Sequence, residues 1–147
     1  MVVRGTYCIC ICVEEDVDVI IGSLGLITFL RGMYIYVGSG LNSLIPRIVR
    51  HIKTSRGTHN VTRWHIDYLL RNPHVSITDV YVLEKPERLE CVISEKVSHQ
   101  GEAVMAFGCS DCRCTSHLYR VGGFEFLEKI GMKRFPIDSP LLPGPEG

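Results

Sequence analysis

The sequence predicts an α/β (α+β) domain in which a small central β-sheet is flanked by helices. Two kinds of local pattern lead to this prediction. Short stretches of alternating residues indicate strands, and amphipathic stretches after residue 42 indicate helices, in the order β-β-β-α-α-β-α-β. The length of 147 residues is that of one domain with a core of its own.

The first strands are predicted from residues that alternate between two faces. Over residues 4–13, Tyr7 and three aliphatic residues take one face, and three cysteines take the other. The stretches "VDVIIGSLG" and "LITFLRGMYIYVG" follow as further strands. In the second of them Tyr34 and Tyr36 share a face, just before a predicted turn at Gly38-Ser39-Gly40.

Helices are predicted where apolar residues recur at helical spacing. Asn42 or Ser43 is the expected N-cap of the first helix, which runs to Thr54. The later elements are a helix over 63–71 capped by Thr62, a strand over 75–83, a helix that begins at Pro86, a cysteine-rich loop leading to a strand, and a short helix or hairpin over 124–135.

The helix after Pro86 carries a carboxylate beside its apolar stripe. The stripe is predicted to comprise Leu89, Val92, Ile93 and Val97. Glu90 flanks this stripe rather than opposing it, which predicts a carboxylate where the helix meets a cleft.

Charge is distributed unevenly, although the net charge is zero. Residues 41–66 hold five basic residues, three histidines and no acid, whereas residues 13–18 hold four acids. One surface should therefore be locally positive, as contact with a phosphate backbone requires. The alternative is a solvated helix face.

The composition favours a cytoplasmic protein. No apolar run reaches the roughly 18 residues needed to span a bilayer, and the first residues lack a charged segment followed by a small-residue cleavage site. We therefore expect no membrane partner. Seven cysteines without a secretory signal are expected to be reduced thiols or metal ligands rather than disulfides.

Four motifs, taken in order, resemble those of a known superfamily. Gly5-Thr6-Tyr7 on the first strand resembles a Gly-x-Tyr motif, and Tyr36-Val37-Gly38, followed by Ser39, resembles a Tyr-x-Gly motif. With Arg47 in the next helix and Glu90 in a later one, the pattern resembles the GIY-YIG endonuclease superfamily. The stretches "RHIKTSRGTHNVTRWHIDYLL" and "FGCSDCRCTSHL" further resemble its Uri-type branch.

The resemblance covers residues 4–120, so we expect a nuclease domain over 1–120 and a partly irregular C-terminal extension over 121–147. In the superfamily a short hairpin joins the two tyrosine motifs. Here 28 residues separate Tyr7 from Tyr36, which predicts an inserted strand or hairpin. A rival alignment that uses Gly32-Met33-Tyr34 as the first motif leaves no room for that hairpin.

The resemblance implies a metal-dependent endonuclease that hydrolyses phosphodiester bonds of DNA, with RNA as the alternative nucleic acid. Glu90 would bind Mg²⁺ or Mn²⁺, and Arg47 would neutralise the phosphate. Tyr7 and Tyr36 would bracket the attacking water, one of them as general base. The residues expected to contact the nucleic acid are Gly38, Ser39, Arg50, His51, Lys53, Arg63 and His65.

Two other functions suit the same residues. A non-catalytic nucleic-acid-binding module would bind with strong salt dependence but would not cleave. A zinc-stabilised interaction protein would use the basic helix to bind an acidic protein partner.

A zinc site is predicted from the spacing of soft ligands near the C-terminus. Cys109, Cys112, Cys114 and His117 put four metal-binding side chains within nine residues, close enough to surround one Zn²⁺. The alternatives are a buried thiol cluster and a loop whose polar residues face the cleft.

Overall fold

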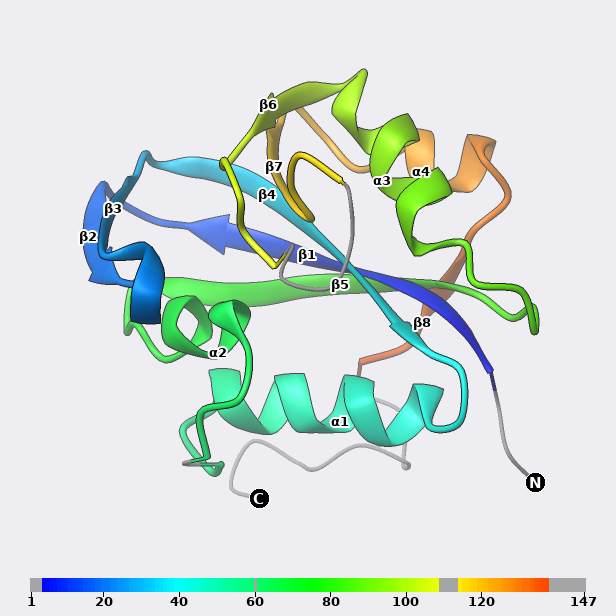
Figure 1. Cartoon of the computed structure of the whole chain (residues 1–147), viewed down its shortest axis with the longest axis horizontal. Helices are drawn as coiled ribbons and strands as arrows, with labels where there is room; N and C mark the ends of the chain where they lie inside the picture. The colour runs from blue at the N-terminus through cyan, green and yellow to red at the C-terminus, as the bar shows by residue number, and fades with distance from the viewer. Residues whose placement is uncertain (1–3, 60, 109–113, 138–147) are drawn as a thin grey trace.

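The computed structural model describes residues 4–59, 61–108 and 114–137, and it confirms the predicted α+β fold. The central element is a six-stranded antiparallel sheet in the order β6-β7-β4-β1-β5-β8 (Figure 1). The elements are β1 (Gly5–Val13), β2 (Val17–Ile20), η1 (Gly22–Leu24), β3 (Leu26–Phe29), β4 (Gly32–Gly40), α1 (Leu44–Ser55), α2 (His65–Leu70), β5 (Val75–Leu83), α3 (Glu90–Ser98), β6 (Gly101–Ala103), β7 (Leu118–Val121), α4 (Phe126–Lys129) and β8 (Lys133–Phe135).

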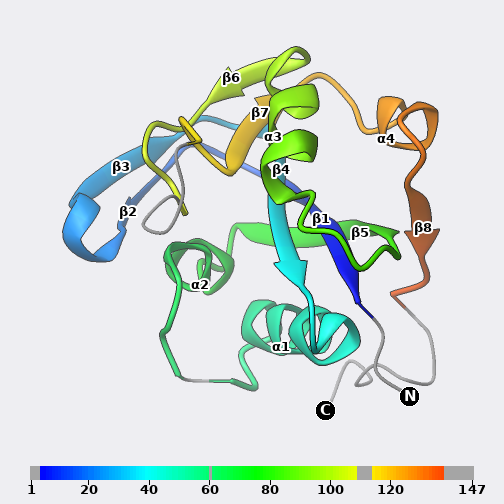
Figure 2. The same ribbon diagram turned by 45° about the vertical axis from the view of Figure 1, so that its right-hand side comes forward.

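Alternation along β1 and β4 divides the core into two layers. Tyr7 and Ile9 of β1 pack with Ile48 of α1 and with residues of α2. Cys8 and Cys10 face the other way and pack with residues of α3 and α4. The two helix pairs accordingly cover opposite faces of the sheet (Figure 2). Because successive side chains of a strand alternate, buried strands supply both layers at once.

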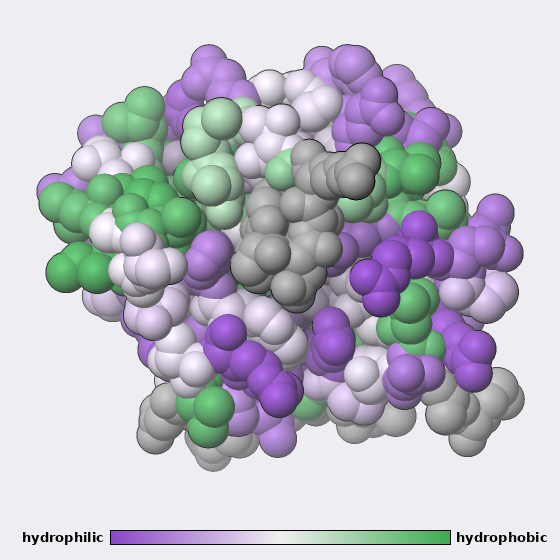
Figure 3. Space-filling model, in the orientation of Figure 1, coloured by the Kyte–Doolittle hydropathy of each residue, from purple (hydrophilic) through white to green (hydrophobic). Residues whose placement is uncertain are grey.

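The inserted hairpin expected between the two tyrosine motifs is present. β2 and β3 pair antiparallel as a separate two-stranded sheet. Ile20 and Leu26 in this hairpin are each 65% exposed, and Leu30 just after it is 48% exposed. The surface over the hairpin is accordingly apolar, as the green area at the left of Figure 3 shows.

Two helices begin later than the sequence predicts. α2 begins at His65 rather than Arg63, and its N-cap is Trp64 rather than the predicted Thr62. The carboxylate of Asp67, the third residue of the helix, accepts the backbone N–H groups of Arg63 and Trp64. Residues 84–89 are not helical, and α3 begins at Glu90 rather than Pro86.

The shorter α3 also buries fewer of the predicted stripe residues. Ile93 and Val97 are buried, whereas Val92 is 47% exposed and was wrongly predicted to be in the core. Ser94, which was not predicted to belong to the stripe, is buried as well. A helix that starts at Glu90 packs along residues one turn apart, so Ile93 and Val97 contact the sheet and Val92 points away from it.

The C-terminal region contributes to the same sheet. β7 includes Val121, and β8 pairs with β5 at the outer edge through residues 133–135. α4 packs Leu127 into the layer formed by Cys8 and Cys10. Among the residues that the structure describes, no helix has the length and apolar character needed to cross a membrane.

Candidate functional site

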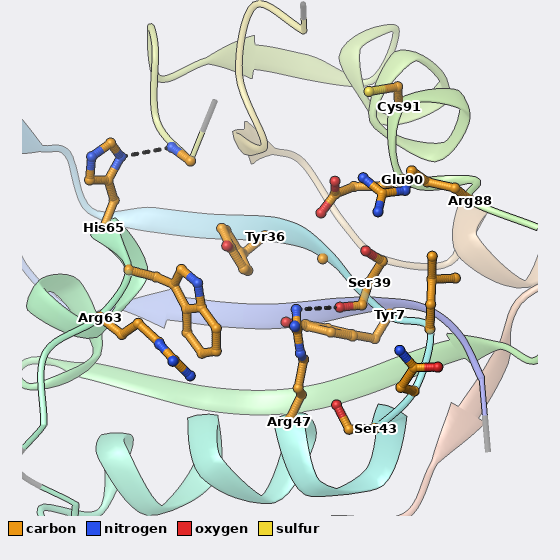
Figure 4. Close-up of a pocket in the computed structure, with 15 residues that line it drawn as sticks. Tyr7, Tyr36, Ser39, Ser43, Arg47, Arg63, His65, Arg88, Glu90 and Cys91 are labelled. Carbon is orange, nitrogen blue, oxygen red and sulfur yellow. Dashed lines mark hydrogen bonds between the residues drawn. The ribbon is translucent and has the colours of Figure 1, made fainter. Parts of the chain in front are cut away.

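Side chains from four separate elements line one cavity of about 540 Å³. Tyr7 comes from β1, Tyr36 from β4, Arg47 from α1 and Glu90 from the first position of α3. Figure 4 shows these four residues around the cavity, which lies between α1 and α3 across the ends of the two central strands. Residues more than 80 positions apart in the sequence therefore share one site.

Strand register explains the Tyr-x-Gly motif. Tyr7 lies opposite Gly38 in the β1–β4 pair. A Cβ atom at Gly38 would approach the Tyr7 hydroxyl to 2.4 Å, so only glycine lets the phenol lie across β4 at this point. The predicted turn at residues 38–40 is wrong, because β4 continues to Gly40 through its pairing with β1. Gly38 and Ser39 still line the cavity.

The Tyr7 phenol is hydrogen-bonded to a buried histidine. Tyr7 Oη lies 2.7 Å from His51 Nε2, and the two side chains are 2% and 0% exposed. Burial raises the pKa of Tyr7 well above its usual value, with a further increase from Tyr36 and an opposing effect of Arg47. Burial also lowers the pKa of His51 to about 4, against an opposing effect of Asp67. At neutral pH the pair is therefore a neutral phenol beside a neutral imidazole.

The lowered pKa of His51 predicts a loss of stability in acid. The unfolded chain binds a proton at His51 near pH 6.5, whereas the folded protein does so only near pH 4. The free energy of unfolding is therefore expected to be highest above about pH 6.5 and to fall by about 3 kcal/mol as the pH is lowered to 4. Urea unfolding of the wild type and His51→Gln between pH 4 and 7 measures it. Parallel pH profiles for the two proteins would contradict this assignment.

Three arginines surround the Trp64 ring. The guanidinium carbons of Arg47, Arg50 and Arg63 lie 5.3, 4.2 and 5.7 Å from its centroid, within the range of cation–π attraction. Arg47 also donates a hydrogen bond from Nη1 to the Ser39 carbonyl oxygen at 2.7 Å. Figure 4 shows the Arg47 side chain extending from α1 towards Tyr7 and Ser39.

The charge of the cavity lining is mostly positive. Arg47, Arg63 and Arg88 line it, and Glu90 is the single carboxylate among the described residues that do so. A cavity with three guanidinium groups and one carboxylate suits a phosphate group better than a cation alone. Arg88 was not predicted, although its position two residues before Glu90 is visible in the sequence.

The other residues predicted to contact nucleic acid lie in different environments. Arg63 and His65 line the cavity, and His65 Nδ1 accepts the Gly108 N–H at 2.9 Å. His51 lies buried behind Tyr7, and Arg50 forms an ion pair of 3.1 Å with Asp67, which is fully buried. Lys53 is exposed and does not line the cavity.

A second group of chemically active side chains lies beside the cavity. One potential ligand atom from each of Cys91, Cys114 and His117 lies within 4.8 Å of the others. Cys114 and His117 belong to the predicted zinc motif, whereas Cys109 and Cys112 lie outside the described residues. Cys91 was not predicted as a ligand, because it is 23 positions before Cys114 and outside any local motif.

Comparison with known proteins gives one family. A profile described as "Domain of unknown function DUF123" matches residues 6–134, which include most of β1, the cavity residues and most of β8. No curated protein and no solved structure matches the chain.

Proposed function

The chain belongs to the DUF123 family, a family of unknown function, and we propose from its site that it is a metal-dependent endonuclease. The proposed reaction is hydrolysis of phosphodiester bonds in DNA, with the residue roles of the GIY-YIG superfamily and its Uri-type branch. Four side chains, namely Tyr7, Tyr36, Arg47 and Glu90, carry these roles.

The observation that carries the proposal is the meeting of these four side chains in one cavity. Phosphodiester hydrolysis requires a proton acceptor for the attacking water, positive charge on the phosphate and a ligand for a divalent ion. Phenols, a guanidinium and a carboxylate supply these three functions. The cavity volume of about 540 Å³ is sufficient for a phosphate with its neighbouring sugars.

Glu90 is the residue that would hold the divalent ion. Mg²⁺ keeps several waters and is commonly bound through one or two carboxylates together with substrate phosphates. The lining fits such an ion, since Glu90 is its carboxylate and oxygen ligands suit Mg²⁺ or Mn²⁺. When bound, the ion would orient the phosphate and neutralise part of its charge.

Arg47 would bind the phosphate from the opposite wall. Its guanidinium remains charged at any working pH and offers donors in a planar fork that matches phosphate oxygens. One donor is held by the Ser39 carbonyl oxygen, and the ring of Trp64 supports the same side chain. An arginine restrained in this way loses little conformational entropy when the phosphate binds.

Tyr7 would accept the proton of the attacking water. Because its pKa is raised, a free phenolate is disfavoured, and the hydrogen bond to His51 offers another route. As Tyr7 Oη takes the proton from water, its own phenolic proton passes to His51 Nε2. Burial of His51 opposes this transfer, and the nearby Asp67 carboxylate offsets part of that effect. Tyr36 would hold the same water from the neighbouring strand.

Nicking of supercoiled plasmid tests the proposal. We expect cleavage by the wild type with Mg²⁺ or Mn²⁺, no cleavage in EDTA, and recovery when Mg²⁺ is added back in excess. Tyr7→Phe should lower the rate by about 10²- to 10⁴-fold, the usual effect of removing a general base. Tyr34→Phe is the matched control, because Tyr34 is buried on the same sheet face and donates to the Leu30 carbonyl oxygen.

Two results of this assay would contradict the proposal. No metal-dependent cleavage of any plasmid or oligonucleotide form would reject an endonuclease. Equal rates for Tyr7→Phe and Tyr34→Phe would reject the role of Tyr7.

A non-catalytic nucleic-acid-binding module is the second candidate. The grouping of Arg47, Arg50 and Arg63 around Trp64 favours it, because an aromatic ring with cations binds single strands without any chemistry. This module would bind DNA or RNA with an affinity that falls steeply with salt, and it would leave the nucleic acid intact in Mg²⁺ and in Mn²⁺.

A further inference from the structure

We propose that Cys91, Cys114 and His117 form a Zn²⁺ site that joins the start of α3 to the segment before β7. The three potential ligand atoms lie within 4.8 Å of one another. Ligand atoms of a tetrahedral zinc site are separated by about 3.8 Å or less, given the usual zinc–sulfur and zinc–nitrogen distances. A contraction of about 1 Å therefore closes the three side chains around one ion.

The ligand types select a soft or borderline metal. Two cysteine sulfurs and one imidazole nitrogen suit Zn²⁺, whereas Mg²⁺ and Mn²⁺ prefer oxygen. Cys91 is exposed, Cys114 is half-buried and His117 is 1% exposed. Cys8 and Cys10, by contrast, are buried among apolar side chains of the core. The exposure of Cys91 distinguishes this cluster from thiols that serve only as core packing.

His117 is held in position from three directions. Ser94 Oγ lies 2.8 Å from its Nδ1, its backbone N–H donates to Phe107, and its carbonyl oxygen accepts the N–H of Val37. A hydroxyl on one ring nitrogen orients a metal-binding imidazole through the other nitrogen. We therefore assign Nε2 of His117 as the zinc ligand, with Ser94 as its supporting contact.

Among the residues that the structure describes, the cluster supplies three of the four ligands of a tetrahedral ion. Cys91 and Cys114 line a second cavity of about 460 Å³, which also includes Ser94. Cys91 lines the first cavity as well, so the proposed zinc site lies between the two.

A zinc ion here would fix the position of Glu90. Cys91 follows Glu90 in the first turn of α3, and His117 is bonded to Val37, which lies between Tyr36 and Gly38 in β4. The ion would therefore connect the carboxylate to the strand that carries Tyr36. This positioning role rests on the proposed nuclease function, whereas zinc binding itself does not.

Metal content tests the site directly. Full-length protein is purified without chelator, its zinc is measured by mass spectrometry, and the apo protein is titrated with Co²⁺, whose thiolate charge-transfer absorption reports cysteine ligands. We expect stoichiometric zinc in the wild type and loss of both zinc and the thiolate band in Cys91→Ser. Cys12→Ser, a half-buried β1 cysteine outside the cluster, should retain both.

Each result decides the proposal. Because Cys91 is exposed, Cys91→Ser is expected to fold, and circular dichroism of this variant checks that it does. The test therefore does not depend on a variant of His117, which is buried and whose replacement could unfold the protein. Absence of stoichiometric zinc in the wild type after reconstitution would overturn the proposal. Zinc retained in Cys91→Ser but lost in Cys109→Ser would overturn it in favour of the local sequence motif. Glu90→Ala should retain zinc whatever its cleavage activity. Failure of the zinc proposal can therefore be distinguished from failure of the proposed nuclease function.

Discussion

Replacement of Arg47 by alanine is expected to lower DNA cleavage by about 10³-fold or more, the range seen when an arginine that stabilises a phosphoryl transition state is removed. Arg47 lines the cavity beside Tyr7 and is held by the Ser39 carbonyl oxygen. Arg50 is not available to replace its charge, because Arg50 forms an ion pair with Asp67. Arg47→Lys should recover little of the rate, since an ammonium lacks the planar fork of donors.

Glu90→Ala should lose cleavage to a similar extent, by removing the carboxylate that would hold the divalent ion. Raising the Mg²⁺ concentration should restore little of it. Single-turnover cleavage of a labelled duplex measures both variants, and circular dichroism checks their fold.

Matched charge changes provide the controls for these two variants. Arg56→Ala removes a positive charge just after α1, and Glu102→Ala removes an exposed carboxylate from β6. Neither residue lines the cavity. Both controls should cleave at close to the wild-type rate. If Arg47→Ala and Glu90→Ala did the same, the proposed roles of these residues would be rejected.

Replacement of Asp67 by alanine is expected to destabilise the fold by about 3–5 kcal/mol, the usual cost of removing one partner from a buried ion pair. Asp67 is 0% exposed. Its carboxylate accepts hydrogen bonds from Arg50 Nη1 and Nη2 at 3.3 and 3.1 Å, and from the backbone N–H groups of Arg63 and Trp64 at 2.8 and 3.0 Å. The variant would leave a largely buried guanidinium without its counter-charge and two backbone donors at the start of α2 without an acceptor.

An exposed ion pair provides the control for Asp67. Asp79 contacts Arg134 at 2.9 Å, but the Arg134 side chain is 66% exposed. Asp79→Ala should therefore cost at most about 1 kcal/mol. Urea unfolding of the three proteins at neutral pH measures the difference. Similar losses for the two variants would show that burial does not determine the contribution of Asp67.

Several elements of the fold could be predicted because their signals are local. β5 was predicted over residues 75–83 and has these bounds in the structure. β1 and α1 were also predicted close to their observed bounds. Alternation along a strand and recurrence at helical spacing depend only on near neighbours, so the chain displays them directly.

Helix starts and edge strands were less predictable. The Asp67 side chain accepts the N–H groups of the two residues before α2, and α3 begins at Glu90, about one turn before the buried Ile93. β6 was not predicted at all, since its three residues carry no strand pattern and are held by pairing with β7. These elements depend on partners that are distant in the sequence.

The sequence by itself determined which residues of β1 and β4 share a face and that residues 41–66 are basic. It also determined the candidate residues Tyr7, Tyr36, Arg47 and Glu90. Only the tertiary structure decided which side chains meet. It brings those four to one cavity, pairs Tyr7 with His51, buries Asp67 against Arg50 and moves Cys91 next to the Cys114–His117 segment. The physical reason is that strand register and helix packing set the distances between residues that are far apart in the chain. A local sequence pattern depends only on neighbouring residues and does not specify those distances.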